Sequence, residues 1–539
     1  MNFIYKLFDR KYSAIVCILL AIANRIVNVM FVSFAGKDKM ILVLQSKSLL
    51  EGHGLSRPFY YFSNPDLAVW NFTPRWPPGY PVVLAPFLKL FNYDVYWATT
   101  TLDIIVCIAF IFVVRKICKQ IGLPAAAVNM ATLIAGVFEY TFIHESLPTD
   151  TISLVFLLIG ITLAIGTLNN PYSLKRILIT GLFLFSPCLF RYSYPPVTLA
   201  VPLLILLAGW MKKDSLLVKK GIGLFITSAL FVGILFLCIK LSTGEASFIL
   251  ETKRGIYIGN LTSWFPFIPS SFINVAFITS QVTQKTGVPF SQSMLLLEII
   301  NAIASLFLVA LFIFLLKKRF FVKPDAFKWF LLIGAVVSAA VVGSLGYLSF
   351  TYHIQESYYG GWNYVAEARY FAFINIFLQI AFLGWVTLYR NSIKNLFFKI
   401  IAGFIAILLF IEVSHNIYFH AKVALNYKGY KSVVFREQDY NYFDRLIPQL
   451  EKEYPGYDIM AAAPDDNYYY HTASYLGYKG IEDAAPLKLG QPIVNRPAIL
   501  ILMLFDNEVE DYKKTIEKDN VVFLKEINRS KFYLIKLEP

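Results

Sequence analysis

Charged residues are scarce in this sequence: Asp, Glu, Lys and Arg make up 16% of its 539 residues, whereas 57% are hydrophobic. Soluble globular proteins hold about a quarter of their residues as these four types. This deficit excludes an ordinary soluble fold for most of the chain and indicates that lipid is its solvent. The net charge of +14 lies in short basic clusters between apolar runs, so it does not indicate a nucleic-acid partner.

Cysteine pairs and metal-ligating motifs are also missing. The five cysteines lie in apolar runs or directly after basic residues, which excludes a disulfide framework and a CxxC metal site. The sequence has no HExxH motif, no P-loop and no dinucleotide-binding glycine pattern, and its six histidines show no ligand spacing. We therefore expect no metal site and no cofactor.

Apolar runs long enough to cross a bilayer recur along the first four fifths of the chain. The first is too long for a signal peptide and lacks an A-x-A cleavage site, which favours an uncleaved helix. The pattern predicts about eleven transmembrane helices. Their expected ranges are 13–34, 95–114, 123–142, 150–168, 176–192, 194–211, 219–241, 292–316, 327–349, 370–389 and 397–418.

Lysine and arginine cluster on alternate connections between these helices, from residues 6–11 near the N-terminus to residues 390–399. The connection 143–149, on the opposite side, contains neither. By the positive-inside rule the N-terminus is cytoplasmic and the chain after residue 419 is outside. We expect a multi-pass protein of the plasma (inner) membrane.

The expected fold class is an all-α polytopic membrane domain, residues 1–419, followed by a small extracytoplasmic α/β domain, residues 420–539. Outer loops are expected at 35–94, 242–291 and 350–369, and loops of such length are usually functional. Periodicity in the tail predicts helices at Tyr440–Lys452 and Glu508–Lys518, and strands at Asp458–Ala463, Ala498–Phe505, Val521–Leu524 and Phe532–Leu537.

Three carboxylates at outer helix ends are candidates for chemistry, because charge near membrane depth is expensive without a purpose. Asp38 follows the first helix and can act as a general base, although a solvated residue paired with Lys37 or Lys39 is the simpler interpretation. Glu145 and Asp150 precede and open a helix, where Asp150 can also serve only the helix dipole.

Arginines near the outer ends of helices are candidates for binding a phosphate. Arg369, followed by Tyr370, presents a planar fork of donors, and Arg191 and Arg75 add positive charge on the same side. The alternative is contact with anionic lipid headgroups. Arg25 lies within the first helix and needs a partner inside the bundle.

Several short motifs occur in a recognisable order. Asp38 leads to a Leu-Leu-x-Gly-x-Gly turn at residues 49–54, and Pro-Pro-Gly-Tyr-Pro at 77–81 opens an apolar stretch too short to span. Glu145 or Asp150 stands before a later helix, and Arg369-Tyr370 opens another. In these features the chain resembles the GT-C glycosyltransferases, especially the protein-mannosyltransferase-like and aminoarabinose-transferase-like branch.

The resemblance implies an inverting glycosyltransferase (a hexosyl- or pentosyltransferase) that moves a sugar from a polyprenyl-phosphate donor to a lipid, glycan or protein acceptor. It implies that Asp38 acts on the acceptor hydroxyl, that Glu145 or Asp150 positions a substrate, and that Arg369, with Arg191, stabilises the phosphate. Lys39 departs from the family pattern, in which many relatives have a second acid or an aromatic residue. Two alternatives stay open: a transporter or flippase of lipid-linked glycans, and a non-catalytic assembly protein.

Overall fold

The computed structural model divides into two compact units, which are described separately below. The first comprises the described residues of Met1–Met30, Asp103–His144 and Pro148–Leu425, and the second those of Phe31–Leu102 and Asn426–Pro539. The structure describes residues 8–9, 12–32, 37–72, 77–137, 148–244, 325–351, 368–388, 396–426, 431–464, 468–481, 485–488, 494–527 and 530–539, with a few isolated residues between 299 and 309.

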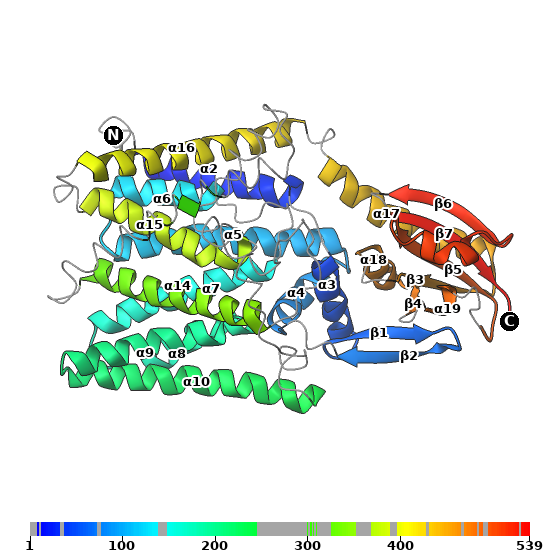
Figure 1. Cartoon of the computed structure of the whole chain (residues 1–539), viewed down its shortest axis with the longest axis horizontal. Helices are drawn as coiled ribbons and strands as arrows, with labels where there is room; N and C mark the ends of the chain where they lie inside the picture. Colours follow the sequence, from blue (N-terminus) through cyan, green and yellow to red (C-terminus); the bar gives the residue numbers. More distant parts are fainter. Residues whose placement is uncertain are drawn as a thin grey trace. The chain divides into compact units, whose positions relative to one another are not determined.

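The first unit is helical throughout its described part (Figure 1). Its helices are α2 (Ser13–Val27), continued by η1 (Asn28–Val32), α5 (Val95–Gln120, whose first residues belong to the second unit), α6 (Ala125–Val137), α7 (Pro148–Asn169), α8 (Leu174–Phe185), η2 (Ser186–Leu189), α9 (Pro195–Met211), α10 (Ser215–Thr243), α14 (Ala326–Thr351), η6 (Ala368–Phe371), α15 (Ala372–Leu388) and α16 (Leu396–Leu425).

Six helices in the described part of the chain are long and apolar enough to cross a membrane, which agrees with a multi-pass membrane protein. The expected number of about eleven is not confirmed. Shorter apolar helices, α6, α9 and α15, stand where three further spans were expected. The expected span 292–316 and the expected outer segments 242–291 and 350–369 lie almost wholly outside the described residues.

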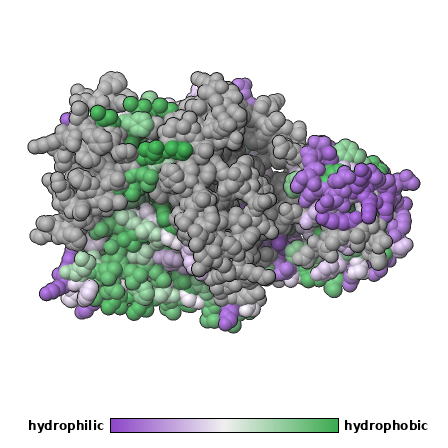
Figure 2. All heavy atoms as spheres, in the orientation of Figure 1, coloured by the Kyte–Doolittle hydropathy of each residue, from purple (hydrophilic) through white to green (hydrophobic). Residues whose placement is uncertain are grey.

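Apolar side chains are exposed along the outward faces of α9 and α10, which pack against each other. Leu207 is 53% exposed, and Ile226 and Leu230 are each 60% exposed. Figure 2 shows apolar residues over this part of the unit. A soluble protein seldom leaves so large an apolar surface uncovered, so this face is suited to lipid.

Helix α6 ends inside the bundle, and side chains from two other helices satisfy its last carbonyls. Arg25 donates to the carbonyl of Ala135 through Nε at 3.1 Å and Nη2 at 2.9 Å. The amide of Asn24 donates to Gly136 at 2.9 Å, and that of Asn416 to Val137 at 3.0 Å. The last carbonyls of a helix have no partner within it, and lipid offers none. The partner that Arg25 required is therefore the C-terminus of α6.

Helices α2 and α6 approach each other so closely at Gly136 that no side chain fits there without a backbone shift. A Cβ at this position would lie 2.3 Å from the Cα of Ala21, closer than real Cβ contacts come. We expect Gly136→Ala to destabilise the protein by about 1–3 kcal/mol, because the backbone of α2 would have to move. Gly343→Ala is the matched control, since no atom lies within 4 Å of its added Cβ. Thermal unfolding in detergent measures both, and equal midpoints would contradict the close approach.

The second unit joins the described part of residues 31–102 to the tail (Figure 1). The first segment contributes α3 (Lys37–Leu50), β1 (Ser56–Tyr61), β2 (Asn64–Phe72) and α4 (Gly79–Leu90). The tail contributes α17 (Lys431–Glu453), β3 (Asp458–Ala462), α18 (Tyr468–Leu476), β4 (Lys479–Ile481), α19 (Ala485–Lys488), β5 (Ala498–Phe505), η9 (Glu510–Tyr512), α20 (Lys513–Ile516), β6 (Val521–Ile527) and β7 (Ser530–Leu537).

A seven-stranded sheet organises this unit, with the strand order β2-β1-β4-β3-β5-β7-β6. Strands β4, β3 and β5 are parallel, and β1 continues the parallel edge by pairing Tyr60 with Ile481. The sequence predicts a loop of the membrane domain for the β1–β2 region and a domain boundary at residue 419, which falls within α16. The structure instead puts these strands in the sheet of the tail, because β4 offers them an open edge.

Strand β5 lies between β3 and β7 and is buried on both faces. Ile499, Ile501 and Met503 pack with residues of α17 and α18, whereas Leu500 and Leu502 pack toward α19 and η9. A continuous apolar run is expected of such a doubly covered strand. On the α17 side, burial raises the pKa of the Tyr478 hydroxyl, which donates to the carbonyl of Phe443 at 3.2 Å. The hydroxyl therefore stays protonated as a donor.

Candidate functional site

Asp38 lies in the first turn of α3, rather than in the open loop that the sequence suggested. The glycines that follow the helix, Gly52 and Gly54, adopt φ angles of 87° and 66°, which only glycine takes up readily. Among the residues that the structure describes, the half-buried carboxylate of Asp38 has no hydrogen-bond or ion-pair partner. A carboxylate with this exposure and no described partner is available to accept a proton from a substrate, as a general base must.

Lys39, the residue that departs from the family pattern, is enclosed by the second unit. Its side chain is 1% exposed, although it follows the half-buried Asp38 directly. An ammonium group is seldom buried to this extent without a purpose. The simpler interpretation of Asp38, a solvated residue paired with Lys37 or Lys39, requires an exposed ammonium, and the burial of Lys39 does not fit that role.

Asp150 and Arg191 form a buried ion pair in the first unit. Asp150 opens α7, and Arg191 lies in the short connection between η2 and α9. The Oδ1 atom of Asp150 contacts Nη2 of Arg191, and the two side chains are 5% and 9% exposed. The other carboxylate oxygen, Oδ2, has no hydrogen-bond partner among the described residues, and neither has the Thr149 hydroxyl beside it. This leaves two buried polar atoms at the start of α7 that are able to bind a polar ligand.

Tyr370 lies against the same guanidinium, with the Cζ atom of Arg191 4.8 Å from the centre of its ring. A cation over an aromatic face is attracted by the ring quadrupole and is held in a defined orientation. The structure thus brings together three residues that the sequence singled out separately: Asp150, Arg191 and Tyr370. Arg369 precedes Tyr370 in η6, and its side chain lies outside the described part.

Two expected site residues, Glu145 and Arg75, lie outside the described residues. Asp38 belongs to the second compact unit, whereas Asp150, Arg191 and Tyr370 belong to the first. Within the described ranges, no three His, Cys, Asp or Glu side chains lie close enough together to share a metal ion.

A polar cluster that no sequence motif predicts extends the cap of α6. His420 on α16 contacts Oδ1 of Asn24 through Nδ1 at 2.9 Å, and Nδ2 of Asn28 through Nε2 at 3.1 Å. Because the amide nitrogen of Asn24 already donates to Gly136, its oxygen must accept, so Nδ1 of His420 carries a proton. The only signal in the sequence was a set of polar residues in apolar helices. Their spacing did not show that they meet.

Comparison with known proteins gave structural similarity alone. No family model matches the chain, and no curated protein matches it. The solved structure of ArnT from Cupriavidus metallidurans bound to undecaprenyl phosphate is similar over 97% of this chain and 98% of that chain, with a TM-score of 0.54 and 10% identity. The apo state of the same ArnT covers 96% and 97% of the two chains, with a TM-score of 0.47 and 12% identity.

A more distant similarity is to the archaeal oligosaccharyltransferase AglB from Archaeoglobus fulgidus, solved with an inhibitory peptide and a dolichol-phosphate. It covers 93% of this chain and 70% of that chain, with a TM-score of 0.46 and 11% identity. Of these three structures, ArnT with bound undecaprenyl phosphate alone exceeds a TM-score of 0.5, and it extends over nearly the whole of both chains. This chain therefore has the fold of the GT-C glycosyltransferases, as its sequence resemblance predicted.

Proposed function

We propose that this protein is an inverting, metal-independent membrane glycosyltransferase, which moves a sugar from a polyprenyl-phosphate donor to an acceptor on the extracytoplasmic face. The observation that carries the proposal is the buried cluster of Asp150, Arg191 and Tyr370 in a chain with this fold. A guanidinium held in place by a carboxylate and an aromatic ring suits a phosphate, because it is preorganised and permanently charged. The undecaprenyl phosphate bound to ArnT supports the same class of donor.

In the proposed reaction, an acceptor hydroxyl attacks the anomeric carbon of the donor and transfers its proton to Asp38. A new glycosidic bond forms as the bond from the anomeric carbon to the phosphate oxygen breaks. The electron pair of that bond leaves with the polyprenyl phosphate. Arg191, with Arg369, stabilises the charge that develops on this phosphate, in a site from which water is largely excluded. Glu145 or Asp150 positions a sugar hydroxyl, and a single displacement inverts the anomeric centre.

The activity is tested with the purified full-length chain in nanodiscs and an undecaprenyl-phosphate hexose labelled in the sugar. Transfer releases undecaprenyl phosphate and moves the label into an acceptor added from a panel of lipids, glycans and peptides. Movement of intact labelled donor between leaflets, without release of the phosphate, would favour a flippase instead. Neither transfer nor translocation with any of several hexose and pentose donors would contradict the proposal and favour an assembly protein.

A further inference from the structure

Helix α3, which carries Asp38, is enclosed by its own unit. From Lys39 to Ser46 each of its residues is buried, including polar residues such as Gln45. The helix packs against α4, β1 and α18. Since α18 belongs to the tail, a segment more than four hundred residues away in the sequence forms part of the surroundings of α3.

Tyr475 of α18 makes polar contacts both with α3 and with the residues that follow α4. Its carbonyl accepts a hydrogen bond from Nζ of Lys47 at 2.7 Å, and the same Nζ lies 5.0 Å from the centre of its ring. Its hydroxyl donates to the carbonyl of Tyr93, just beyond the end of α4, at 2.6 Å. Tyr475 is 3% exposed, whereas the side chain of Lys47 is 26% exposed and Tyr93 is 39% exposed. One residue of the tail thus bonds to α3 through its backbone carbonyl and to the end of α4 through its hydroxyl. We call this set of contacts the Tyr475 clasp.

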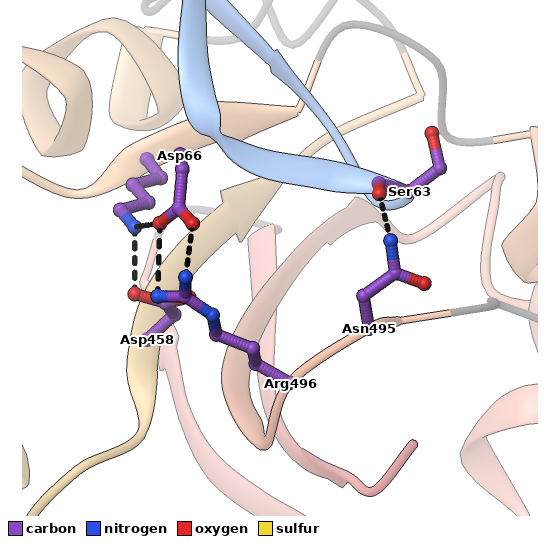
Figure 3. Close-up of polar contacts among 6 residues, drawn as sticks. Ser63, Asp66, Asp458, Asn495 and Arg496 are labelled. Atoms are coloured by element: carbon purple, nitrogen blue, oxygen red, sulfur yellow. Dashed lines mark hydrogen bonds and ion pairs between the residues drawn. The ribbon is translucent and has the colours of Figure 1, made fainter.

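A second set of contacts holds the hairpin that follows α3. Asp66 on β2 pairs with Arg496 at 2.5 Å and with Lys479 at 3.7 Å, and Lys479 also pairs with Asp458 at 2.6 Å (Figure 3). The amide of Asn495 donates to the carbonyl of Ser63 at the hairpin turn. Arg496 is 61% exposed and Asp66 48%, and exposed ion pairs stabilise weakly. The hairpin contacts therefore add little stability, and the position of α3 depends mainly on the Tyr475 clasp.

We propose that the tail acts on the reaction by positioning: Tyr475, through Lys47, holds α3 so that Asp38 at its other end is fixed. Lys47 stands nine residues after Asp38, about 14 Å along the helix axis. A helix transmits a constraint over this distance because its backbone hydrogen bonds keep it rigid. The inference rests on the proposed function, in which Asp38 receives the acceptor proton. It makes Lys47 and Tyr475 positioning residues and assigns the tail domain a part in catalysis.

The test compares Lys47→Met with a control that removes the same kind of contact elsewhere in the unit. Lys488 lies 5.4 Å from the ring centre of Tyr512 and pairs with Asp511 at 3.0 Å, so Lys488→Met removes a cation from a ring and an ion pair without affecting α3. Two quantities are measured on the full chain in nanodiscs: amide hydrogen exchange of α3, and kcat and KM with an undecaprenyl-phosphate hexose.

We expect Lys47→Met to accelerate exchange in α3 about tenfold and to lower kcat about tenfold, with KM for the donor unchanged within twofold. Lys47→Arg should keep most of the wild-type protection of α3 from exchange and most of the wild-type kcat. Lys488→Met should match the wild type in both quantities. If Lys47→Met fails to fold, Tyr475→Phe removes only the bond to Tyr93 and is expected to change the same quantities less. Faster exchange in α3 with an unchanged kcat would overturn the inference, and so would unchanged exchange. A wild-type chain without transfer activity would refute the proposed function, while the exchange data would still decide whether the tail holds α3.

Discussion

Asp38→Asn is expected to lower the rate of glycosyl transfer about a thousandfold while the protein stays folded, because general base catalysis commonly contributes between a hundredfold and ten-thousandfold. The amide has nearly the same shape as the carboxylate but cannot accept the acceptor proton. Asp38 has no partner among the residues that the structure describes, so the substitution breaks no described ion pair or hydrogen bond. The measurement is release of undecaprenyl phosphate under single-turnover conditions.

Asp94→Asn is the matched control for this substitution. Asp94 lies in the same unit and accepts a hydrogen bond from the backbone N–H of Trp97 at 3.0 Å, at the start of α5. Asparagine caps helices about as well as aspartate, so this variant should keep both its stability and its turnover. Turnover by Asp38→Asn within about threefold of the control would remove Asp38 from the mechanism.

Arg191→Met is expected to destabilise the first unit by about 3–5 kcal/mol, because it leaves the carboxylate of Asp150 buried without its cation. Asp150→Leu alone should cost a similar amount, because it removes the carboxylate that pairs with the buried guanidinium. The double variant should recover most of the stability, since replacing a buried ion pair by apolar side chains is often neutral. Thermal or denaturant unfolding in detergent measures all three variants.

The same variants separate stability from function. If Arg191 binds the phosphate, the double variant should fold and still fail to transfer sugar. Lys513→Met, which removes an exposed cation paired with Glu510 at 3.4 Å, should change stability by less than about 1 kcal/mol. A double variant whose loss of stability equals the sum of the two single losses would show that Asp150 and Arg191 act independently, contrary to the ion pair.

Much of the local structure followed from the sequence pattern. Strand β5 has the expected bounds, because an apolar run of this length between turn residues suits a doubly covered strand. Helix α4 begins at Gly79, within the Pro-Pro-Gly-Tyr-Pro motif, and exposes Val82 and Leu90 while burying Leu84 and Leu88. The helix expected at Glu508–Lys518 is instead two short turns, η9 and α20. The segment 508–518 has too few apolar residues to bury one face of a longer helix.

The candidate site could be predicted only as separate residues. Charge and position near a helix end make Asp150, Arg191 and Tyr370 candidates one by one, but their contact depends on how α7, η2 and η6 pack. The partner of Arg25 was equally hidden, because it is a backbone carbonyl that becomes available where α6 ends. A carbonyl has no signature in the sequence.

The sequence by itself predicted most of the long apolar helices and the strands β3, β5, β6 and β7, because apolar length and periodicity depend on neighbouring residues. Only the tertiary structure decided that the hairpin of the first outer segment joins the tail sheet, and that Tyr475 meets Lys47. These contacts link residues some four hundred positions apart. They depend on an open strand edge and on shape complementarity, which no local pattern of residues encodes.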